Sequence, residues 1–478
     1  MKNIVAEIVE RRKKDIEKKG FGFGFKIPEK RCRPVNVFMA QKGAILEIKR
    51  ASPSKGDIAP NLDCVETALK YRENGARAIS CLTEENYFKG NLGDLMAVCA
   101  AVPDVAVLRK DFLIDEKEIE ISYLCGADAV LLICGILSLE KMLSMTAECA
   151  RLGIRAFVEV RTEEDVQKVL ELKKHYGDTI VCGVNSRNLK DFSIDLLVPA
   201  MLKKALGGDV VFESGITTPE TAGKVGAMGF WGILLGEFAA RNPQRAGEFV
   251  RSFEGADENL WGKKFVELAQ KVKCRRSDRP LIKICGLTRP EDVLLADFLG
   301  TDFLGFVFAG EFGRNVYGEK FEGIRKIFGS VKAFKVGVIT RPESEEAHFA
   351  AELVKAGVLD FVQVHGVKPE DLPSYLKEIP HYFALTVKNG SLKTQAEEAC
   401  SIGEPRFLLE SKSQNWCMEE SAGGEHLWIA GGLTPENIRS LCQKIKPELV
   451  DVSGGVEGEN LGVKDEARLR KFFAEAVF

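Results

Sequence analysis

The chain has 478 residues, of which 45% are hydrophobic and 29% are charged, so it is long enough to form two large cores or three average ones. Its 67 Lys and Arg residues nearly balance 70 Asp and Glu residues, and the net charge of −3 gives no reason to expect a nucleic-acid partner. The five histidines form no cluster with ligand spacing, so we also expect no metal site.

The N-terminal segment is densely charged, and the longest apolar run spans only residues 129–137. A signal peptide needs an apolar core and a transmembrane helix needs about 20 apolar residues, so we expect a cytoplasmic protein that does not enter a membrane. The 13 cysteines are scattered and never form a Cys-x-x-Cys pair. That pattern favours reduced thiols over a disulfide framework.

In the first half of the chain, short runs rich in β-branched residues alternate with helix-like stretches. Eight such pairs predict a parallel (β/α)8 barrel, and residues 1–42, which precede the first strand, are expected to cap it. The expected strands are residues 44–49, 78–83, 105–110, 129–134, 155–160, 179–184, 209–214 and 232–236.

The strand pattern lapses over a basic segment and then restarts. We therefore predict two consecutive (β/α)8 barrels in an α/β protein, covering residues 1–254 and 281–478 with a linker at 255–280. An open doubly wound sheet would normally carry Gly-x-Gly-x-x-Gly after its first strand, and neither half does. The second set of strands is expected at residues 281–285, 302–308, 334–339, 361–365, 382–387, 406–410, 427–432 and 448–455.

Polar residues recur at the ends of the strands in the first half. Strand periodicity places Glu47 and Lys49 on one face, and the carboxyl ends of barrel strands line the active-site mouth. The alternative for any one pair is an exposed position in a loop. The same pattern recurs at Lys110, Glu159, Asn185, Arg187, Glu213 and Ser214, and Gly215 and Gly236 follow the last two strands, where such barrels bind phosphate.

Five segments of this half, EIKRASPSKG, LTEENYFKG, LRKDFLID, GVNSRNL and FESGI, resemble the signature segments of indole-3-glycerol-phosphate synthase in order and spacing. The resemblance covers roughly residues 1–250. It implies an enzyme that closes the ring of a phosphorylated anilino-deoxyribulose with loss of carbon dioxide and water, using neither a metal nor an organic cofactor.

The resemblance also implies roles for individual residues. Lys110 would protonate the substrate carbonyl, Glu159 would act in the dehydration and Lys49 would steer the substrate carboxylate. An acidic lysine at neutral pH needs a pKa below its ordinary value of about 10.4, which a nearby cation such as Lys49 would favour. Glu47, Asn185 and Glu213 would hold these groups and the substrate hydroxyls, and Ser52, Ser54, Phe88, Arg187 and Ser214 would line the pocket.

In the second half, Lys283 and Cys285 share one strand face, and Cys285 ends its strand just before a glycine. A buried, inert thiol is the alternative for this cysteine. The segments ICGLTRPEDV, DFLGFVF, VGVI, VQVHG, AGGLTPENI and DVSGGVE resemble phosphoribosylanthranilate isomerase over roughly residues 281–478. That resemblance implies an Amadori rearrangement without a cofactor.

In this second resemblance Cys285 would be the base that takes a proton from the sugar carbon, and Arg314 would hold the anthranilate carboxylate. Glu410 stands where the family has an aspartate acid, and the segment SKSQNWCMEESAGGEHLW lacks the family's Gly-rich loop and Phe-x-Trp motif. His365 and Asp451 would bind substrate, and phosphate would lie against Gly431, Gly432, Ser453 and Gly454.

These observations leave three hypotheses. In the first, one chain runs two consecutive steps of tryptophan biosynthesis on small phosphorylated anthranilate sugars, with no obligatory protein partner. In the second, only the synthase is active, and the other barrel binds a phosphorylated ligand or serves as a structural module. In the third, both barrels act on other sugar phosphates, which rests on fold analogy alone.

Overall fold

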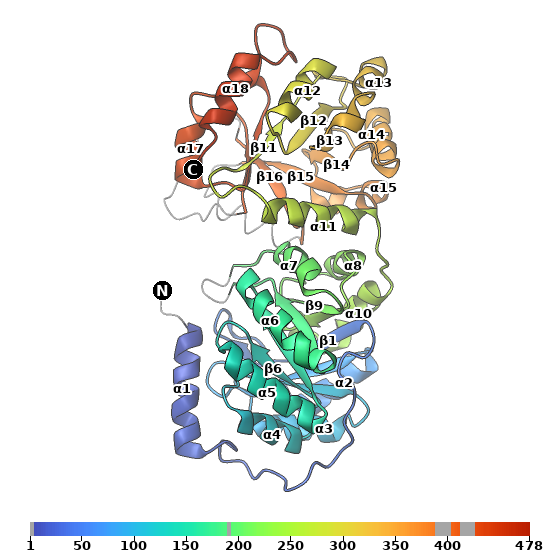
Figure 1. Cartoon of the computed structure of the whole chain (residues 1–478). Helices are drawn as coiled ribbons and strands as arrows, with labels where there is room; N and C mark the ends of the chain where they lie inside the picture. Colours follow the sequence, from blue (N-terminus) through green and yellow to red (C-terminus); the bar gives the residue numbers. More distant parts are fainter. Residues whose placement is uncertain (1–3, 189–192, 388–402, 412–425) are drawn as a thin grey trace. The chain divides into compact units, whose positions relative to one another are not determined.

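The computed structural model describes residues 4–188, 193–387, 403–411 and 426–478 of the chain (Figure 1). The chain divides into two compact units, Met1–Glu258 and Asn259–Phe478. Each unit is built around a closed barrel of eight parallel strands, which confirms the prediction of two consecutive (β/α)8 barrels. Among the described residues, no helix is long and apolar enough to cross a membrane.

In the first barrel each strand pairs in parallel with the next, and β1 closes the ring by pairing with both β4 and β10. A short hairpin, β2 (Ala51–Ser52) and β3 (Gly56–Asp57), follows β1. The barrel strands are β1 (Gly43–Ile48), β4 (Ala78–Leu82), β5 (Ala106–Lys110), β6 (Ala129–Ile133), β7 (Arg155–Val160), β8 (Ile180–Asn185), β9 (Val210–Glu213) and β10 (Gly232–Leu235).

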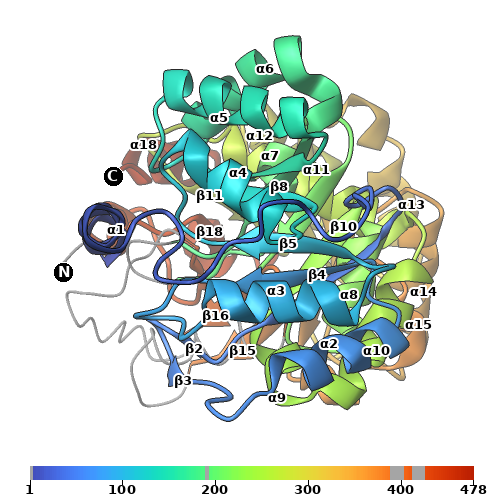
Figure 2. The same ribbon diagram turned by 90° about the horizontal axis from the view of Figure 1, so that it is seen from below.

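Helices cover the outside of these strands: α2 packs on β1 and α3 packs on β4, and Figure 2 shows α3 beside β4. Helices α2 to α6 and α8 each begin at a polar side chain that accepts a backbone hydrogen bond from the first turn, which ends the preceding loop at a defined residue. The helices are α1 (Ile4–Lys19), α2 (Cys64–Glu73), α3 (Leu92–Ala101), α4 (Glu116–Leu124), α5 (Leu139–Leu152), α6 (Glu163–Tyr176), α7 (Val198–Leu206), α8 (Pro219–Ala227), α9 (Glu237–Arg241) and α10 (Ala246–Glu254).

The segment before β1 closes the end of the first barrel where its strands begin. Phe38 and Met39 are buried among the residues of the barrel interior. The Phe38 ring meets Phe157 of β7 edge to face at 5.7 Å, and the Met39 carbonyl accepts a hydrogen bond from Trp231 Nε1 at 3.0 Å. These two residues therefore seal the barrel opposite the mouth that holds the polar strand ends.

The second barrel repeats this architecture from β11 to β18, and β11 pairs with β18 to close it. One layer of its interior consists of aromatic side chains, and the centroids of neighbouring rings lie 5.2 to 6.3 Å apart. The strands are β11 (Leu281–Ile284), β12 (Phe303–Val307), β13 (Phe334–Ile339), β14 (Phe361–His365), β15 (His381–Thr386), β16 (Phe407–Glu410), β17 (Trp428–Ala430) and β18 (Leu449–Val452).

Helix α11 (Leu260–Lys273) occupies much of the segment that we expected to be a linker, and it lies across the lower end of the second barrel (Figure 1). Trp261 stacks on Phe265 with centroids 4.1 Å apart, and Phe265 meets Phe361 edge to face. The side chains of Trp261 and Phe265 are both buried, so α11 closes this end of the barrel. The other helices are α12 (Pro290–Phe298), α13 (Glu319–Arg325), α14 (Glu345–Lys355), α15 (Ser374–Lys377), α17 (Ile438–Ile445) and α18 (Glu466–Glu475).

Candidate active sites

A largely buried lysine, Lys110, whose side chain is 14% exposed, stands at the centre of the mouth of the first barrel. Its Nζ lies 2.9 Å from Glu213 Oε2 and 3.4 Å from Glu47 Oε2. The other oxygen of Glu47 lies 2.7 Å from Lys49 Nζ. Strands β1, β5 and β9 thus bring four of the predicted residues into one ionic cluster, although they are far apart in the sequence.

Two more predicted residues lie beside this cluster at the ends of β7 and β8. Asn185 Nδ2 donates a hydrogen bond to Glu159 Oε1 at 3.3 Å, and Asn185 Oδ1 accepts one from the backbone N–H of Arg187 at 2.9 Å. The Glu159 carboxylate is close enough to act electrostatically on Lys110. The mouth therefore holds three carboxylates and two ammonium groups that converge from the ends of four strands, β1, β5, β7 and β9.

The balance of burial and charge sets the protonation of this cluster. Burial alone would raise the pKa of Glu47, but Lys49 and Lys110 outweigh it and bring the pKa to about 2. Burial raises the pKa of Glu213 to about 7, and the Glu159 carboxylate adds to this effect against the attraction of Lys110. Near neutral pH a proton is therefore easily held by Glu213, while Glu47 stays ionised.

The expectation that Lys49 lowers the pKa of Lys110 is wrong. Burial does act to lower the pKa of Lys110, but the carboxylates of Glu213, Glu47 and Glu159 outweigh it and hold the pKa above its ordinary value. Glu47 lies between the two lysines and contacts both of them, so each ammonium meets a carboxylate first. Lys110 is therefore an ammonium across the physiological pH range.

The remaining predicted residues of this half surround the cluster at different depths. Ser52 and Ser54 lie together in the hairpin after β1, with their hydroxyl oxygens 3.5 Å apart. The Phe88 ring lies 6.0 Å from Lys49 Nζ. Burial lowers the pKa of Arg187. Ser214 and Gly215 continue β9 in left-handed backbone conformation, with φ of 69° and 77°.

Gly236, which we expected at a phosphate site, lies directly beside the ionic cluster. It precedes the short helix α9, and a Cβ at this position would stand 2.9 Å from Glu47 Oε1 and 3.1 Å from Lys49 Nζ. Only a residue without a side chain leaves the glutamate and lysine their present positions. The backbone after β10 therefore approaches closely the groups that would meet the substrate.

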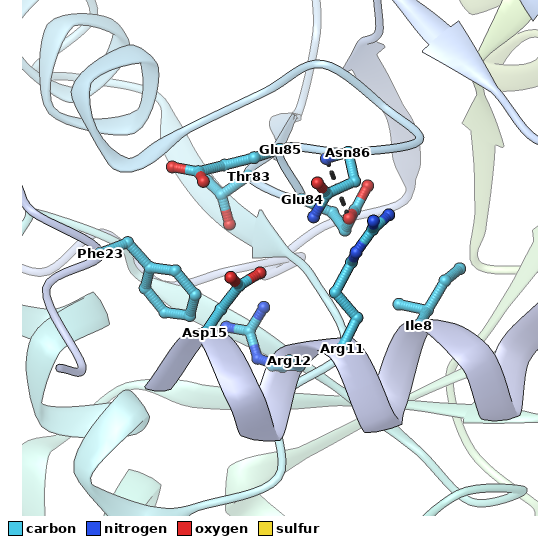
Figure 3. Close-up of a pocket in the computed structure, with 9 residues that line it drawn as sticks. All are labelled: Ile8, Arg11, Arg12, Asp15, Phe23, Thr83, Glu84, Glu85 and Asn86. Carbon is cyan, nitrogen blue, oxygen red and sulfur yellow. Dashed lines mark hydrogen bonds between the residues drawn. The ribbon is translucent and has the colours of Figure 1, made fainter. Parts of the chain in front are cut away.

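Helix α1 is anchored to the residue that follows Lys110. The buried Arg12 donates from Nη1 to Asp111 Oδ1 at 2.7 Å and from Nε to Glu118 Oε1 at 2.8 Å. Asp111 also accepts from the Arg109 guanidinium, so it lies between two cations. Figure 3 shows Arg12 at a hollow between α1 and the segment after β4, which is lined by Ile8, Arg11, Arg12, Asp15, Phe23, Thr83, Glu84, Glu85 and Asn86.

In the second barrel, Cys285 follows β11 and is buried at the mouth. Burial raises the pKa of its thiol, although the cations Lys283 and Lys464 act against this. Lys464 Nζ donates to the Cys285 carbonyl at 2.7 Å and so fixes the backbone at this position. The thiol is the resting form, and a thiolate would depend on the two neighbouring cations.

The other polar residues of this interior form a connected set. Lys283 Nζ lies 2.6 Å from Asp451 Oδ2 and donates to Gln363 Oε1 at 2.6 Å. His365 lies two residues after Gln363 on β14, and its Nδ1 lies 3.9 Å from Glu410 Oε2. The predicted residues Cys285, Glu410, His365 and Asp451 therefore all belong to one mouth. The segment 412–425, whose sequence departs from the isomerase pattern, lies outside the described residues.

Arg314, which we expected to bind a substrate carboxylate, is paired with a carboxylate of the protein. Its Nε and Nη2 lie 2.7 Å from the two oxygens of Glu457, the geometry that a guanidinium offers to any carboxylate. Lys464 Nζ also holds Glu457, at 3.0 Å. The pair fixes the guanidinium near Gly454, where a Cβ would lie 3.2 Å from Arg314 Nη2.

The four residues predicted to hold phosphate lie on adjacent loops, because β17 pairs with β18. Gly431 and Gly432 follow β17 with φ of 101° and 64°, a conformation that favours glycine. Ser453 and Gly454 follow β18. The structure thus brings together two glycine-containing turns at the carboxyl ends of strands, where phosphate-binding backbone amides are expected.

Comparison with known proteins agrees with this geometry. The family model "Indole-3-glycerol phosphate synthase" matches residues 6–252, and the family model "N-(5'phosphoribosyl)anthranilate (PRA) isomerase" matches residues 282–475. The chain belongs to the indole-3-glycerol phosphate synthase family, joined to a PRA isomerase domain.

Curated relatives of this chain include proteins named for tryptophan biosynthesis as a whole and proteins named for the synthase alone. A "Tryptophan biosynthesis protein TrpCF" of Vibrio parahaemolyticus is 30% identical over 90% of this chain and 83% of its own length. An "Indole-3-glycerol phosphate synthase" of Exiguobacterium sibiricum is 35% identical over 54% of this chain and all of its own length. A "Multifunctional tryptophan biosynthesis protein" of Phanerodontia chrysosporium is 30% identical, and the chain spans 62% of that relative.

Sequence reasoning missed several residues that shape the synthase mouth. Ser80 donates to Glu47 Oε2 at 3.4 Å, and it could have been found as an isolated polar residue in the apolar run AISCL. The Tyr71 hydroxyl donates to the Glu47 carbonyl at 3.1 Å. Gly183 of β8 leaves room for Glu213, because a Cβ there would stand 2.3 Å from Oε1. Neither of these two contacts leaves a pattern in the sequence.

Proposed function

We propose that the chain is a bifunctional cytoplasmic enzyme of tryptophan biosynthesis. The second barrel would isomerise N-(5'-phosphoribosyl)anthranilate to 1-(2-carboxyphenylamino)-1-deoxyribulose 5-phosphate, and the first barrel would convert that product to indole-3-glycerol phosphate. The observation that carries the proposal is the meeting of Lys110 with Glu47 and Glu213 in the first mouth. The matches of both units to enzyme families of this pathway support it.

The synthase step needs a cation at the substrate ketone and a proton donor for the later loss of water. As the aromatic carbon that bears the carboxylate bonds to the ketone carbon, Lys110 gives a proton to the ketone oxygen. Carbon dioxide then leaves with its bond electrons returned to the ring. Glu159 serves the dehydration, in which the hydroxyl leaves as water and a second proton is lost to complete the indole.

The other members of the ionic cluster position these groups. Lys49 would attract the substrate carboxylate, which lies where the new carbon–carbon bond forms. Glu47, with its pKa held near 2, remains ionised and fixes both lysines at hydrogen-bond distance. Because the carboxylates keep Lys110 protonated, it acts as a fixed positive charge as well as a proton donor.

The isomerase step needs an acid and a base on opposite sides of the sugar carbons. Glu410 would protonate the ring oxygen as its bond to the anomeric carbon breaks, and the anthranilate nitrogen would then form a C=N bond to that carbon. Cys285, as a thiolate, would take the proton from the adjacent carbon to give an enolamine, which rearranges to the aminoketose. Arg314 would hold the anthranilate carboxylate.

The test supplies N-(5'-phosphoribosyl)anthranilate to the purified full chain and follows the loss of its fluorescence and the appearance of indole-3-glycerol phosphate. We expect Lys110→Met to stop at the aminoketose and Cys285→Ala to leave the first substrate unchanged. Cys285→Ala should still convert supplied aminoketose, because its first barrel is intact. If the wild type converts the aminoketose but leaves the first substrate unchanged, the chain has one activity and the second barrel is silent.

A further inference from the structure

A line of polar side chains crosses the interior of the second barrel beneath Glu410. It begins with the ion pair between Lys283 on β11 and Asp451 on β18, continues to Gln363 on β14 and ends at His365. Lys283 is fully buried and Gln363 is 1% exposed, so water has little access to this line as far as Gln363, while the His365 side chain at its end is partly exposed. In such surroundings each donor must face an acceptor.

The orientation of the Gln363 amide follows from its partners. Lys283 Nζ lies 2.6 Å from one atom of the amide, and the Tyr382 hydroxyl lies 2.9 Å from the same atom. An ammonium group has only donors, so that atom is the carbonyl oxygen Oε1. The amide nitrogen of Gln363 therefore points the other way along β14, where it contacts Nε2 of the His365 ring.

The orientation of the amide decides where His365 carries its proton. An amide nitrogen donates and does not accept, so His365 Nε2 must be the acceptor and carries no hydrogen. A neutral imidazole has one N–H, which then lies on Nδ1. Nδ1 is the ring atom that faces Glu410, at 3.9 Å from Oε2. A small rotation of the Glu410 side chain brings the two atoms within hydrogen-bond distance.

We infer that Gln363 is a positioning residue of the isomerase, which holds His365 neutral with its proton on Nδ1 and so presents a hydrogen-bond donor to Glu410. This inference rests on the proposed function of the second barrel. It adds a role for a residue that touches neither the base nor the acid directly.

The arrangement suits an acid that must begin its step protonated. A cationic imidazole beside Glu410 would hold the carboxylate ionised, and an ionised Glu410 has no proton to give. The Gln363 amide excludes that cation, because a second N–H on Nε2 would point at the N–H of the amide. Once Glu410 has given its proton to the ring oxygen, its carboxylate can accept the Nδ1–H of His365.

The first measurement is a nitrogen-15 correlation spectrum of the histidine rings of the full-length protein at neutral pH, which distinguishes protonated from bare ring nitrogens. The chain has only five histidines, and His365→Asn identifies the signals of His365. We expect a protonated Nδ1 and a bare Nε2. A protonated Nε2, in a neutral or a cationic ring, would overturn the inference whether or not isomerase activity is present.

The second measurement links the tautomer to turnover. Gln363→Glu keeps the length of the side chain but offers an acceptor to Nε2, so the proton should move from Nδ1 to Nε2. We expect the isomerase kcat to fall about tenfold with a much smaller change in KM, and the synthase activity to stay the same. Tyr382→Phe is the matched control, because Lys283 alone still orients the amide and the tautomer should not change.

The outcomes separate the two proposals. If Gln363→Glu switches the tautomer and the isomerase kcat is unchanged, the positioning role is wrong and the proposed function stands. If the wild type shows the expected tautomer and does not isomerise its substrate, the proposed function of this barrel fails, and the positioning role fails with it.

Discussion

Gly305 lies on β12 beside Cys285, and the missing side chain at this position makes the space for the thiol. A Cβ at residue 305 would stand 2.7 Å from Cys285 Sγ and 3.1 Å from its Cα. Because the backbone as well as the side chain is in the way, the cysteine could not simply turn aside. The position of the proposed base therefore depends on a glycine of the neighbouring strand.

Gly305→Ala should lower the isomerase kcat about 100-fold, because a displacement of about 1 Å at a reacting group has an effect of that size. The synthase activity of the same protein should be unchanged. Gly183→Ala is the reciprocal variant: a Cβ there would stand 2.3 Å from Glu213 Oε1, so it should impair the synthase and spare the isomerase. Equal losses of both activities in either variant would contradict the local explanation.

The synthase should lose activity as the pH falls below about 7. The pKa of Glu213 is raised from 4.5 to about 7 by burial, and protonation removes the ion pair that positions Lys110. A pH profile of kcat/KM should therefore show an acid limb near pH 7. Glu213→Gln should be slower and lack this limb, and persistence of the limb would assign it to another group.

The stability of the folded protein should also depend on the protonation of Glu213, but it should fall as the pH rises, whereas the synthase activity falls as the pH drops. The folded protein binds this proton more tightly than the unfolded chain, so the contribution of Glu213 to the unfolding free energy is complete below pH 4.5 and is lost as the pH rises through 7. Glu213→Gln should flatten the dependence of stability on pH over this interval in denaturant titrations.

Arg12→Met should destabilise the first barrel and slow the synthase. Arg12 is 5% exposed and pairs with Asp111 and Glu118, so its removal leaves buried carboxylates with fewer partners, at a cost of about 3 kcal/mol. Asp111 adjoins Lys110, so turnover should fall as well. Lys13→Met, which removes an exposed pair with Glu10, should change neither quantity, and equal behaviour of the two variants would exclude the anchoring role.

Phe265→Ala should destabilise the second barrel by about 3 to 5 kcal/mol, because it empties the buried contact between α11 and Phe361. The isomerase activity should then be lost at a lower temperature than in the wild type, while the heat resistance of the synthase activity is unchanged. Phe298→Ala removes a phenylalanine that is 78% exposed and should have little effect. A fragment that begins at residue 281, which lacks α11, should fold poorly.

The sequence allowed the barrels and the strand-end residues to be predicted, because strand periodicity and family motifs are local signals. It did not predict the surroundings of Lys110, since the nearest charge depends on side-chain geometry across three strands and Glu47 lies between the two lysines. The pairing of Arg314 with Glu457 was missed for a similar reason, because 143 residues separate them in the chain. The sequence indicated a linker where helix α11 lies, because the contact that holds this helix is tertiary: Phe265 is buried against Phe361, which is far away in the chain.

Each barrel keeps its apolar closure at one end and its chemical groups at the other, with Phe38 and Met39 closing the first barrel and Trp261 and Phe265 closing the second. Laboratory evolution can exploit this separation. A library confined to the strand ends changes substrate preference while the residues that seal the barrel, and much of the stability, stay fixed. Each half of the chain is therefore a scaffold on which new sugar-phosphate reactions could be selected without first being stabilised.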